Sequence, residues 1–580
     1  MRVGSWEDAA LEPADVLESR ATAGTRFFWY LLLYSHESRL MPNVPRTNTL
    51  PGEPTSPWLA ETLEEPPVDS SAPSSDERPS SEEIPLEQAF GADDDPVDVA
   101  VIGAGIAGLS TAFELREQGQ TVLVLERDRV GTGVTGKSTA KLTSQHGQIY
   151  DHLTREFGSR QARQYAQTQE DAIDTVEQRI ADLGIECGFE RVPSYLYSNE
   201  PDTMEREAEA ARAAGLDATY VTSVPPFERS QAGVRFDEQA WFHPRKYLLG
   251  IADALAEDDD ATIAEGTEVT DLEPGSPCQI RANGQRVRAR QVVLATGFPI
   301  FDRAGYFARM HPKRSYVLGV RLDGRPPEGM YYRPGDPYRS VRTHRDEDGE
   351  LLLVGGENHK TGQGGSTIDR YQRLLRWTRE HFPVRSVEYH WSTQDYVPAD
   401  QVPLVGRAGP RTENVSVATG FRGWGMTNGV AAGRLLAGLI AGDQPSTRSL
   451  FDPLRFTPKP SLGTTLTENA DTASTFATDW LQTLFGPDHA ALEPGEGTVI
   501  REGGKPVACA RDADGDLHTT SAVCTTCTVS SSGTTPKAAG TVPVTAPDST
   551  RRRGTRGAGN RPVTDSRHPV GAIASAPAVE

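Results

Sequence analysis

The stretch "DVAVIGAGIAGLSTAFELREQGQTVLVLE", Asp98 to Glu126, decides the fold. It opens with an apolar strand that ends at Ile102, and the pattern G-x-G-x-x-G follows directly. Apolar residues then recur at helical spacing, and a second apolar strand ends in an acidic residue. Because this order is typical of a dinucleotide-binding βαβ unit, the sequence predicts an α/β protein built on a parallel sheet.

Each glycine of the pattern has a physical task. Gly103 permits the tight turn, Gly105 lets the backbone approach a pyrophosphate, and Gly108 lets the helix pack closely on the strand. Glu126 can accept hydrogen bonds from an adenosine ribose, which favours FAD or NAD over NADP. An ordinary glycine-rich loop is the alternative. The cofactor contacts predicted here are Gly103, Ala104, Gly105, Ile106, Ala107, Gly108, Glu126 and Arg127.

Two later segments repeat the order of strand and glycine turn. In "RARQVVLATGFP" a strand ends in Ala295, Thr296 and Gly297, and it resembles the later FAD-contact strand of glutathione-reductase-like flavoproteins. In "VSVATGFRGWGMTNGVAAGRLLAGLIAG" a helix that starts near Met426 would direct its positive end at a reduced flavin. We expect Gly423, Gly425 and Met426 to contact the cofactor, although a plain glycine-rich helix cap is the alternative.

Over about residues 97–440 the chain resembles the D-amino-acid-oxidase-like FAD-dependent oxidoreductases. It is most similar to a microbial subgroup with a C-terminal Rieske [2Fe-2S] domain. The resemblance implies a Rossmann-like FAD-binding domain at 96–440, with an inserted antiparallel-sheet substrate domain at roughly 185–240 and 305–390. The segment "TGKSTAKLTSQHGQIYDHL" resembles the subgroup's loop across the isoalloxazine, which would bring Ser138, Thr139 and Lys141 near the flavin. A solvated basic turn is the alternative.

The family generally takes a hydride from a carbon next to an amine and passes it to the flavin, which leaves an imine for hydrolysis. The implied partners are an amine or amino-acid substrate and oxygen or another electron acceptor. Candidates for the substrate face are His146, Tyr316, Arg342 and Trp424, each of which also has a structural interpretation. Arg342 would clamp a carboxylate and Trp424 would cover the flavin. His243, in "WFHPRK", is expected to start a helix rather than to act as a base.

Composition limits the class of protein. The formal net charge of −22 argues against a nucleic-acid partner, because phosphate binding needs a basic face. The longest apolar run, "FFWYLLLY", is too short to span a bilayer and precedes no cleavage site. Five cysteines in 580 residues do not form a disulfide framework, so we expect a reducing cytoplasm.

The N-terminal region has the composition of a disordered segment. Residues 61–95 contain twelve Asp or Glu residues against one Arg, together with several Pro and Ser residues. We expect residues 1–95 to form a disordered acidic leader. Residues 1–40 precede a second methionine, Met41, and are interpreted as an extension from a misplaced start, with a genuine arm as the alternative. A linker is expected at 441–475.

The C-terminal region contains half of a metal-site pattern. Residues 476–528 predict a partial, all-β Rieske-like unit in which "SAVCTTC" resembles the first ligand loop. Cys524 would be a ligand, but Thr526 stands where a histidine is needed, and no cysteine follows Cys527. Because a Rieske centre needs two Cys and two His ligands, we expect no cluster to assemble on this chain. The two cysteines could still bind zinc weakly or form a redox pair.

The tail at 529–580 suggests why the second half of the pattern is missing. Back-translation of "SSSGTTPKAAGTVPVTAPDST", read one base earlier, permits a peptide that contains C-P-C-H-G-S, the second Rieske ligand loop. We interpret the tail as out of frame after a small deletion near Thr525, with a diverged tail as the alternative. Three further readings of function stay open: a non-catalytic product of a frameshifted gene, an electron-transfer reductase linked to a Rieske cluster, and an NAD-dependent dehydrogenase.

Overall fold

The structure is a computed structural model that describes residues 50–63, 95–227, 229–302, 304–361, 366–455, 497–502, 505–511 and 517–521.

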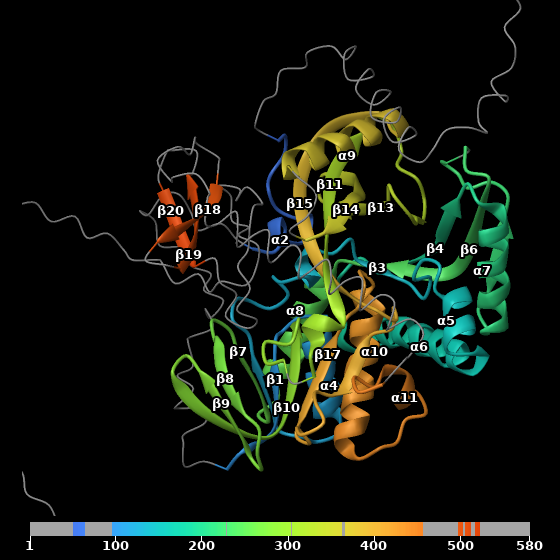
Figure 1. Cartoon of the computed structure of the whole chain (residues 1–580). Helices are drawn as coiled ribbons and strands as arrows, with labels where there is room; N and C mark the ends of the chain where they lie inside the picture. Colours follow the sequence, from blue (N-terminus) through green and yellow to red (C-terminus); the bar gives the residue numbers. More distant parts are fainter. Residues whose placement is uncertain are drawn as a thin grey trace, which may run out of the picture. The chain divides into compact units, whose positions relative to one another are not determined.

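The dinucleotide fingerprint lies in an eight-stranded sheet (Figure 1). Five strands form its parallel part: β1 (Val97–Ile102), β2 (Val122–Leu125), β7 (Ala261–Ala264), β10 (Gln285–Gly297) and β17 (Val415–Thr419). The strand order is β16-β17-β10-β1-β2-β7, in which β16 (Leu404–Arg407) runs antiparallel to β17. The hairpin of β8 (Val269–Glu273) and β9 (Cys278–Ala282) extends from β10. Because the parallel strands share one direction, the three segments predicted to contact the cofactor follow β1, β10 and β17 at the same edge.

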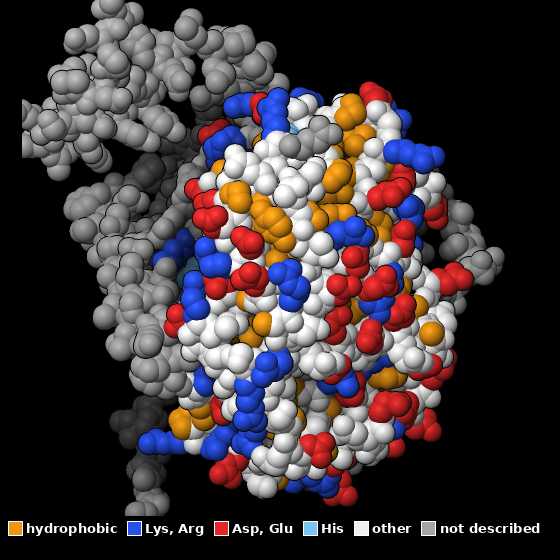
Figure 2. All heavy atoms as spheres, turned by 90° about the vertical axis from the view of Figure 1, so that its right-hand side faces the viewer, with side chains coloured by type: hydrophobic (Ala, Val, Ile, Leu, Met, Phe, Trp, Pro, Cys, Tyr) orange, Lys and Arg blue, Asp and Glu red, His pale blue; other side chains and the backbone are white. Residues whose placement is uncertain are grey.

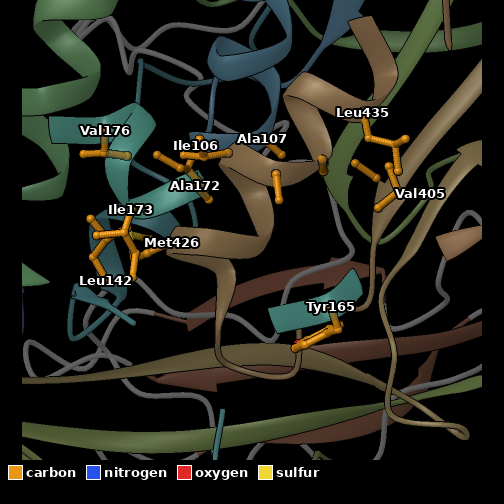
Figure 3. Close-up of a cluster of buried hydrophobic side chains, with 14 of the residues drawn as sticks. Ile106, Ala107, Leu142, Tyr165, Ala172, Ile173, Val176, Val405, Met426 and Leu435 are labelled. Carbon is orange, nitrogen blue, oxygen red and sulfur yellow. The ribbon is translucent and has the colours of Figure 1, made fainter. Parts of the chain in front are cut away.

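Helices α4 (Ile106–Glu117) and α10 (Gly425–Ala441) pack against each other through glycines. A Cβ added at Gly433 would lie 2.7 Å from the Cβ of Ser110, and one added at Gly429 would lie 2.7 Å from Cγ2 of Ile106. Figure 3 shows the core beside this contact, where α4 and α10 meet α6 (Ser159–Leu183). The small residues let the two helix axes approach closely. Because α4 follows β1 and α10 follows β17, both helices begin at the edge that carries the predicted cofactor contacts.

A second, nine-stranded sheet has the order β15-β11-β14-β13-β12-β4-β6-β3, with β5 paired to β6. Its strands are β3 (Lys141–Leu142), β4 (Glu190–Ser198), β5 (Ala218–Val221), β6 (Ala232–Trp241), β11 (Met310–Leu322), β12 (Met330–Arg333), β13 (Arg339–Asp346), β14 (Gly349–Lys360) and β15 (Val384–Pro398). The pairings are antiparallel except for β4 with β12, where the two inserted segments of the chain join in parallel. The sheet confirms the predicted class, an α/β dinucleotide-binding fold with an inserted and mostly antiparallel sheet.

Four further helices accompany these sheets: α5 (Tyr150–Glu156), α7 (Pro201–Ala213), α8 (Pro244–Ala256) and α9 (Thr367–His381). The side chain of His243 accepts a hydrogen bond from the amide of Lys246 and caps α8. The prediction that His243 starts a helix is therefore confirmed.

The N-terminal leader differs from its prediction. Residues 52–63 are ordered on the second sheet: Glu53 pairs with the edge strand β15, and helix α2 (Pro57–Ala60) follows. Trp58 is fully buried. The expectation of disorder up to residue 95 was wrong here because it extended the acidic composition of residues 61–95 to the segment before them, where Trp58 fills a buried site.

The predicted start of the linker, residue 441, also lies too early in the chain. Helix α11 (Arg448–Phe451) follows α10, and its Leu450 and Phe451 are buried in the same core. These two apolar residues stand within a polar stretch, so composition alone placed them in the linker. The described domain continues to Arg455.

A separate three-stranded antiparallel sheet comprises β18 (Gly497–Glu502), β19 (Lys505–Arg511) and β20 (Leu517–Ser521). It lies within the range expected for a small β unit. Cys524, Cys527 and the tail at 529–580 lie outside the described residues, so their interpretation as a broken Rieske site stays a prediction.

In the part of the chain that the structure describes, no helix has the length and apolar character needed to cross a membrane. On the face shown in Figure 2, acidic and basic side chains are interspersed.

Candidate functional site

The glycine-rich turn between β1 and α4 has the shape that a pyrophosphate requires. Gly103 has a φ of +105°, and a Cβ there would lie 2.8 Å from the carbonyl oxygen of Ala295. A Cβ at Gly108 would lie 1.8 Å from the carbonyl oxygen of Gly103. Gly105 is the N-cap of α4 and makes no side-chain cap. Side chains at Gly103 and Gly108 would collide with these carbonyls, so the turn, which we call the cradle, requires glycine; its place at the start of α4 fits the phosphates of FAD.

Glu126 faces this turn from the end of β2. One carboxylate oxygen accepts a hydrogen bond from the amide of Ala104 at 2.8 Å, and the other accepts from the amide of Asp128 at 2.9 Å. These two amides fix the carboxylate beside the cradle, and each oxygen retains acceptor capacity for a ribose hydroxyl. The adjacent Arg127 is exposed and pairs with Asp128 at 3.0 Å, so its contacts here are with protein.

The short helix η2 (Thr135–Lys137) touches the same turn. Thr135 Oγ1 accepts a hydrogen bond from the amide of Ile106 at 3.1 Å, in the first turn of α4. Ser138 and Thr139 are half-buried. Lys141 points elsewhere, because its Nζ donates to the carbonyl oxygen of Tyr331 at 2.6 Å and to Ser340 Oγ at 2.7 Å. Burial and the nearby Arg342 lower the pKa of Lys141 well below its usual range.

The end of β10 lies against the glycine-rich turn at Gly103. Ala295 contributes the carbonyl that lies against Gly103, and Gly297 has a φ of +77°. Thr296 Oγ1 donates to the carbonyl oxygen of Phe298 at 2.6 Å. The register between β10 and β17 shifts between Leu294 and Gly297, and the two strands pair again at Gly297 and Thr419. The predicted contacts of this strand therefore lie beside the glycine-rich turn.

The turn before α10 is strained and leads into an aromatic contact. Arg422 and Gly423 have φ values of +58° and +86°, and the helix then begins at Gly425. The ring of Trp424 stacks on His146 at 5.1 Å between centroids and lies 5.0 Å from Tyr332. A positive φ at an arginine is uncommon and marks a turn held by its surroundings.

His146 is fully buried and links three elements. Its Nδ1 lies 2.7 Å from Tyr165 Oη, and its Nε2 lies 2.9 Å from Thr427 Oγ1 in the first turn of α10. Burial and the charge of Arg422 lower the pKa of His146 to about 3. The imidazole is therefore neutral at pH 7 and positions its neighbours.

The other two sequence candidates, Tyr316 and Arg342, make contacts with other groups. Tyr316 is buried in the second sheet and shares a hydrogen bond with His359 at 3.0 Å. Arg342 donates to the carbonyl oxygens of Ala140 at 2.6 Å and of its neighbour Thr343 at 2.9 Å. Arg342 is 1% exposed and its guanidinium is bonded to backbone, which favours a structural role; the predicted clamp for a substrate carboxylate stays a prediction.

Sequence reasoning missed the charged groups beside the turn. Lys313 on β11 and Asp395 on β15 are cross-strand partners, and the amide of Gly423 donates to Asp395. Nζ of Lys313 lies 5.6 Å from the ring centroid of Tyr338, which lies 5.4 Å from the ring of Tyr332. We call this set the turn cluster: Lys313, Tyr332, Tyr338, Asp395, Arg422 and Trp424.

Burial shifts the ionisation of the turn cluster. It raises the pKa of Asp395 to about 6, against the opposing effects of the Gly423 amide and the Lys313 ammonium. Burial, followed by the charge of Arg422, lowers the pKa of Lys313. Asp395 therefore changes charge near neutral pH, as groups in functional sites often do. Lys313 and Asp395 are 82 positions apart in the sequence and gave no sequence signal; the pairing of β11 with β15 brings them together.

The described residues include a group with metal-ligating atoms within 4.8 Å of one another: Glu61, His344 and Asp346. Asp346 pairs with Arg321 at 2.6 Å, and Glu61 lies 2.7 Å from His344 and 3.4 Å from Lys246. These ion pairs account for the group without a metal.

Comparison with known proteins agrees with this geometry. Residues 98–439 match the family model described as DAO, FAD dependent oxidoreductase. The chain is 32% identical over 440 residues to "Putative Rieske 2Fe-2S iron-sulfur protein YhfW" of Bacillus subtilis, which covers 75% of this chain and 86% of that protein. It is 25% identical over 371 residues to gamma-glutamylputrescine oxidoreductase of Escherichia coli, which covers 60% and 84%.

Solved structures show the same fold. L-proline dehydrogenase from P. horikoshii matches with a TM-score of 0.53 at 18% identity, over 62% of this chain and 98% of that one. Glycine oxidase from Geobacillus kaustophilus matches with a TM-score of 0.52 at 18% identity, over 63% and 100%. At this identity the likeness shows a shared architecture.

Proposed function

Because the chain belongs to the DAO family of FAD-dependent oxidoreductases, we propose that it oxidises a carbon–nitrogen bond of an amine or amino acid. The observation that carries the proposal is the common edge at which the glycine cradle, the Glu126 carboxylate and the turn cluster lie. When bound, FAD supplies the acceptor for a hydride from the carbon next to nitrogen. The chain itself has to hold the cofactor, orient the substrate and exclude water.

The cradle residues would hold the cofactor. The turn at Gly103, Gly105 and Gly108 leaves room for the pyrophosphate, and Glu126 is fixed beside it as an acceptor for the ribose. The fit rests on the close backbone approach at Gly108, where any side chain would collide. The N-terminal end of α10 would favour negative charge next to the turn cluster.

The turn cluster would orient the substrate. Lys313 and Arg422 bring two cationic side chains, which suits a substrate that carries a carboxylate. Asp395, with a pKa of about 6, is mostly ionised at pH 7 and would favour an ammonium group in its vicinity. The rings of Tyr332 and Trp424 would exclude water, and neutral His146 would position Trp424 and Thr427.

Product formation tests the proposal. The purified protein, supplied with FAD, is incubated in air with a panel of primary amines, secondary amines and amino acids, and carbonyl products are trapped with a hydrazine reagent. We expect a carbonyl product from at least one of these classes. The Gly108→Ala variant, whose added Cβ would collide with the carbonyl of Gly103 and distort the cradle, is the matched control and should give none. A protein that binds FAD but yields no carbonyl product from any class would contradict the proposal.

A second candidate concerns the exit of the electrons. The most extensive match above bears a Rieske name, and a cluster acting as the acceptor would make this chain a link in electron transfer. Thr526 stands in place of a ligand in this chain, so we propose oxygen or a soluble acceptor instead. Oxygen consumption during turnover, with no iron or sulfide in the purified protein, is the expected result. Stoichiometric iron and sulfide would favour the Rieske alternative.

A further inference from the structure

Residues 52–63, which we call the strap, pack on both the second sheet and the flavin-binding part of the chain. The strap begins at the edge of β15, where the amide of Glu53 donates to the carbonyl oxygen of Glu388 at 2.7 Å. Trp58 is fully buried in a cluster with Ala140, Val317 and Trp391. Complete burial of a tryptophan removes a large apolar surface from water and so stabilises the packing of the strap on the sheet.

Three successive carbonyl oxygens of the loop after Thr135 accept side-chain hydrogen bonds. Gly136 accepts from Ser56 Oγ, and Ser138 accepts from Nε1 of Trp58 at 2.7 Å. Between them, Lys137 accepts from Nε1 of Trp391 at 2.9 Å. Two of the three donors belong to the strap, so the strap fixes which way this loop faces.

The same loop touches the cofactor cradle. Thr135 Oγ1 accepts from the amide of Ile106, and it is the atom nearest to a Cβ placed on Gly105, at 3.3 Å. A Cβ on Gly136 would lie 2.8 Å from Cδ2 of Leu59 on α2. Strap, loop and glycine-rich turn are therefore in continuous contact.

Glu61 anchors the far end of the strap. Its carboxylate lies 2.7 Å from Nε2 of His344 on β13, 3.5 Å from Nε2 of His243 and 3.4 Å from Nζ of Lys246. Although burial opposes the charged form, hydrogen bonds with the two histidines hold the pKa of Glu61 well below its usual range. The anchor therefore keeps its charge throughout the physiological range of pH.

We propose that Trp58 and Glu61 are positioning residues for the cofactor: through the loop at 135–138 they set the width of the cradle and thereby the affinity for FAD. This rests on the proposed binding of FAD at the cradle. The hydrogen bonds above connect the strap to the cradle through the loop at 135–138 and Thr135.

The test compares variants of the full-length chain. Trp58→Phe keeps a ring but removes the donor to Ser138, and Glu61→Gln keeps the shape but removes the charge. Trp377→Phe, on α9 outside these contacts, is the matched control. Three quantities are measured: the FAD dissociation constant, amide exchange at 135–138 in the FAD-free protein, and the unfolding midpoint of the FAD-free protein.

We expect Trp58→Phe and Glu61→Gln to weaken FAD binding by about fivefold or more, since each loses a buried polar contact. Exchange at 135–138 should rise before any FAD is added, whereas Trp377→Phe should change neither. If Trp58→Phe does not fold, Ser56→Ala removes the bond to Gly136 and tests the same claim.

Unchanged FAD affinity in variants that exchange faster at 135–138 would overturn the proposal. So would a loss of affinity that merely follows a lower unfolding midpoint and that the Trp377 variant shares. A wild-type chain that binds no FAD would instead overturn the proposed function, and amide exchange would still show whether the strap holds the loop.

Discussion

The contact between α4 and α10 yields a prediction in which two effects of known size oppose each other. Replacing Gly433 by alanine removes a glycine from a helix interior, which alone would stabilise the helix by ~1 kcal/mol. The added Cβ, however, would lie 2.7 Å from the carbonyl carbon of Ser110 and 2.8 Å from the amide nitrogen of Thr111. Carbon atoms prefer separations of about 3.5–4.0 Å, so the helices have to part by about 1 Å.

Overpacking of this kind costs ~1–3 kcal/mol, so the clash should win. We expect Gly433→Ala to lower the free energy of unfolding by up to ~2 kcal/mol, the difference between these two terms. FAD affinity should fall as well, because the predicted cofactor contacts Gly423, Gly425 and Met426 lie at the N-terminal end of α10. Denaturant unfolding of the FAD-free protein and titration with FAD measure the two effects.

Gly438→Ala in the same helix is the control. A Cβ there would lie 3.4 Å from Oδ2 of Asp443, an ordinary contact. This variant should therefore be as stable as the wild type or gain up to ~1 kcal/mol. If Gly433→Ala proved as stable as Gly438→Ala and bound FAD normally, the reasoning from the helix contact would be refuted.

Three further predictions follow from the site. Gly108→Ala should abolish FAD binding, measured by loss of flavin absorbance after gel filtration; retention of flavin would mean that the cradle lies elsewhere. Asp395→Asn should remove an inflection near pH 6 from the pH profile of kcat/KM, because burial raises the pKa of this carboxyl to about 6. Since that folded pKa exceeds the usual 3.8, the contribution of Asp395 to stability should be lost as pH rises from about 4 to 6, measured as the difference in unfolding free energy between the wild type and the variant. Burial lowers the pKa values of His243 and His344 below 6.5, so the unfolded chain takes up these protons first; in the Asp395→Asn variant, which lacks the opposing effect of that carboxyl, the unfolding midpoint should therefore fall as the solution is acidified below pH 6.5. An unchanged midpoint down to pH 5 would contradict this last prediction.

The parts of the site that one local pattern encodes were predictable from the sequence. Gly103, Gly108 and Glu126 belong to a single βαβ unit, so spacing along the chain carries their geometry. His146 and Trp424 were candidates on resemblance, and the structure stacks their rings at 5.1 Å. Neither spacing nor resemblance could predict which residues of the second sheet lie beside the glycine-rich turn.

The remainder depends on contacts between distant segments. Lys313 and Asp395 become neighbours only through the pairing of β11 with β15. Arg342 has the residue type of a carboxylate clamp, yet the fold directs it at the backbone of Ala140. Trp58 lies in the segment that was predicted to be disordered, yet burial of its ring fixes residues 52–63 on the second sheet. In each case tertiary packing determines which groups the side chain contacts, and a local sequence pattern carries no information about these contacts.

The central claim is that this chain uses FAD to oxidise an amine or amino acid. Its most direct test is the visible spectrum of the FAD-bound protein during anaerobic addition of single amines and amino acids. The account predicts that at least one of them bleaches the flavin absorbance and that admission of oxygen restores it. A fully bound flavin that every such compound leaves oxidised, while dithionite reduces it, would contradict the account.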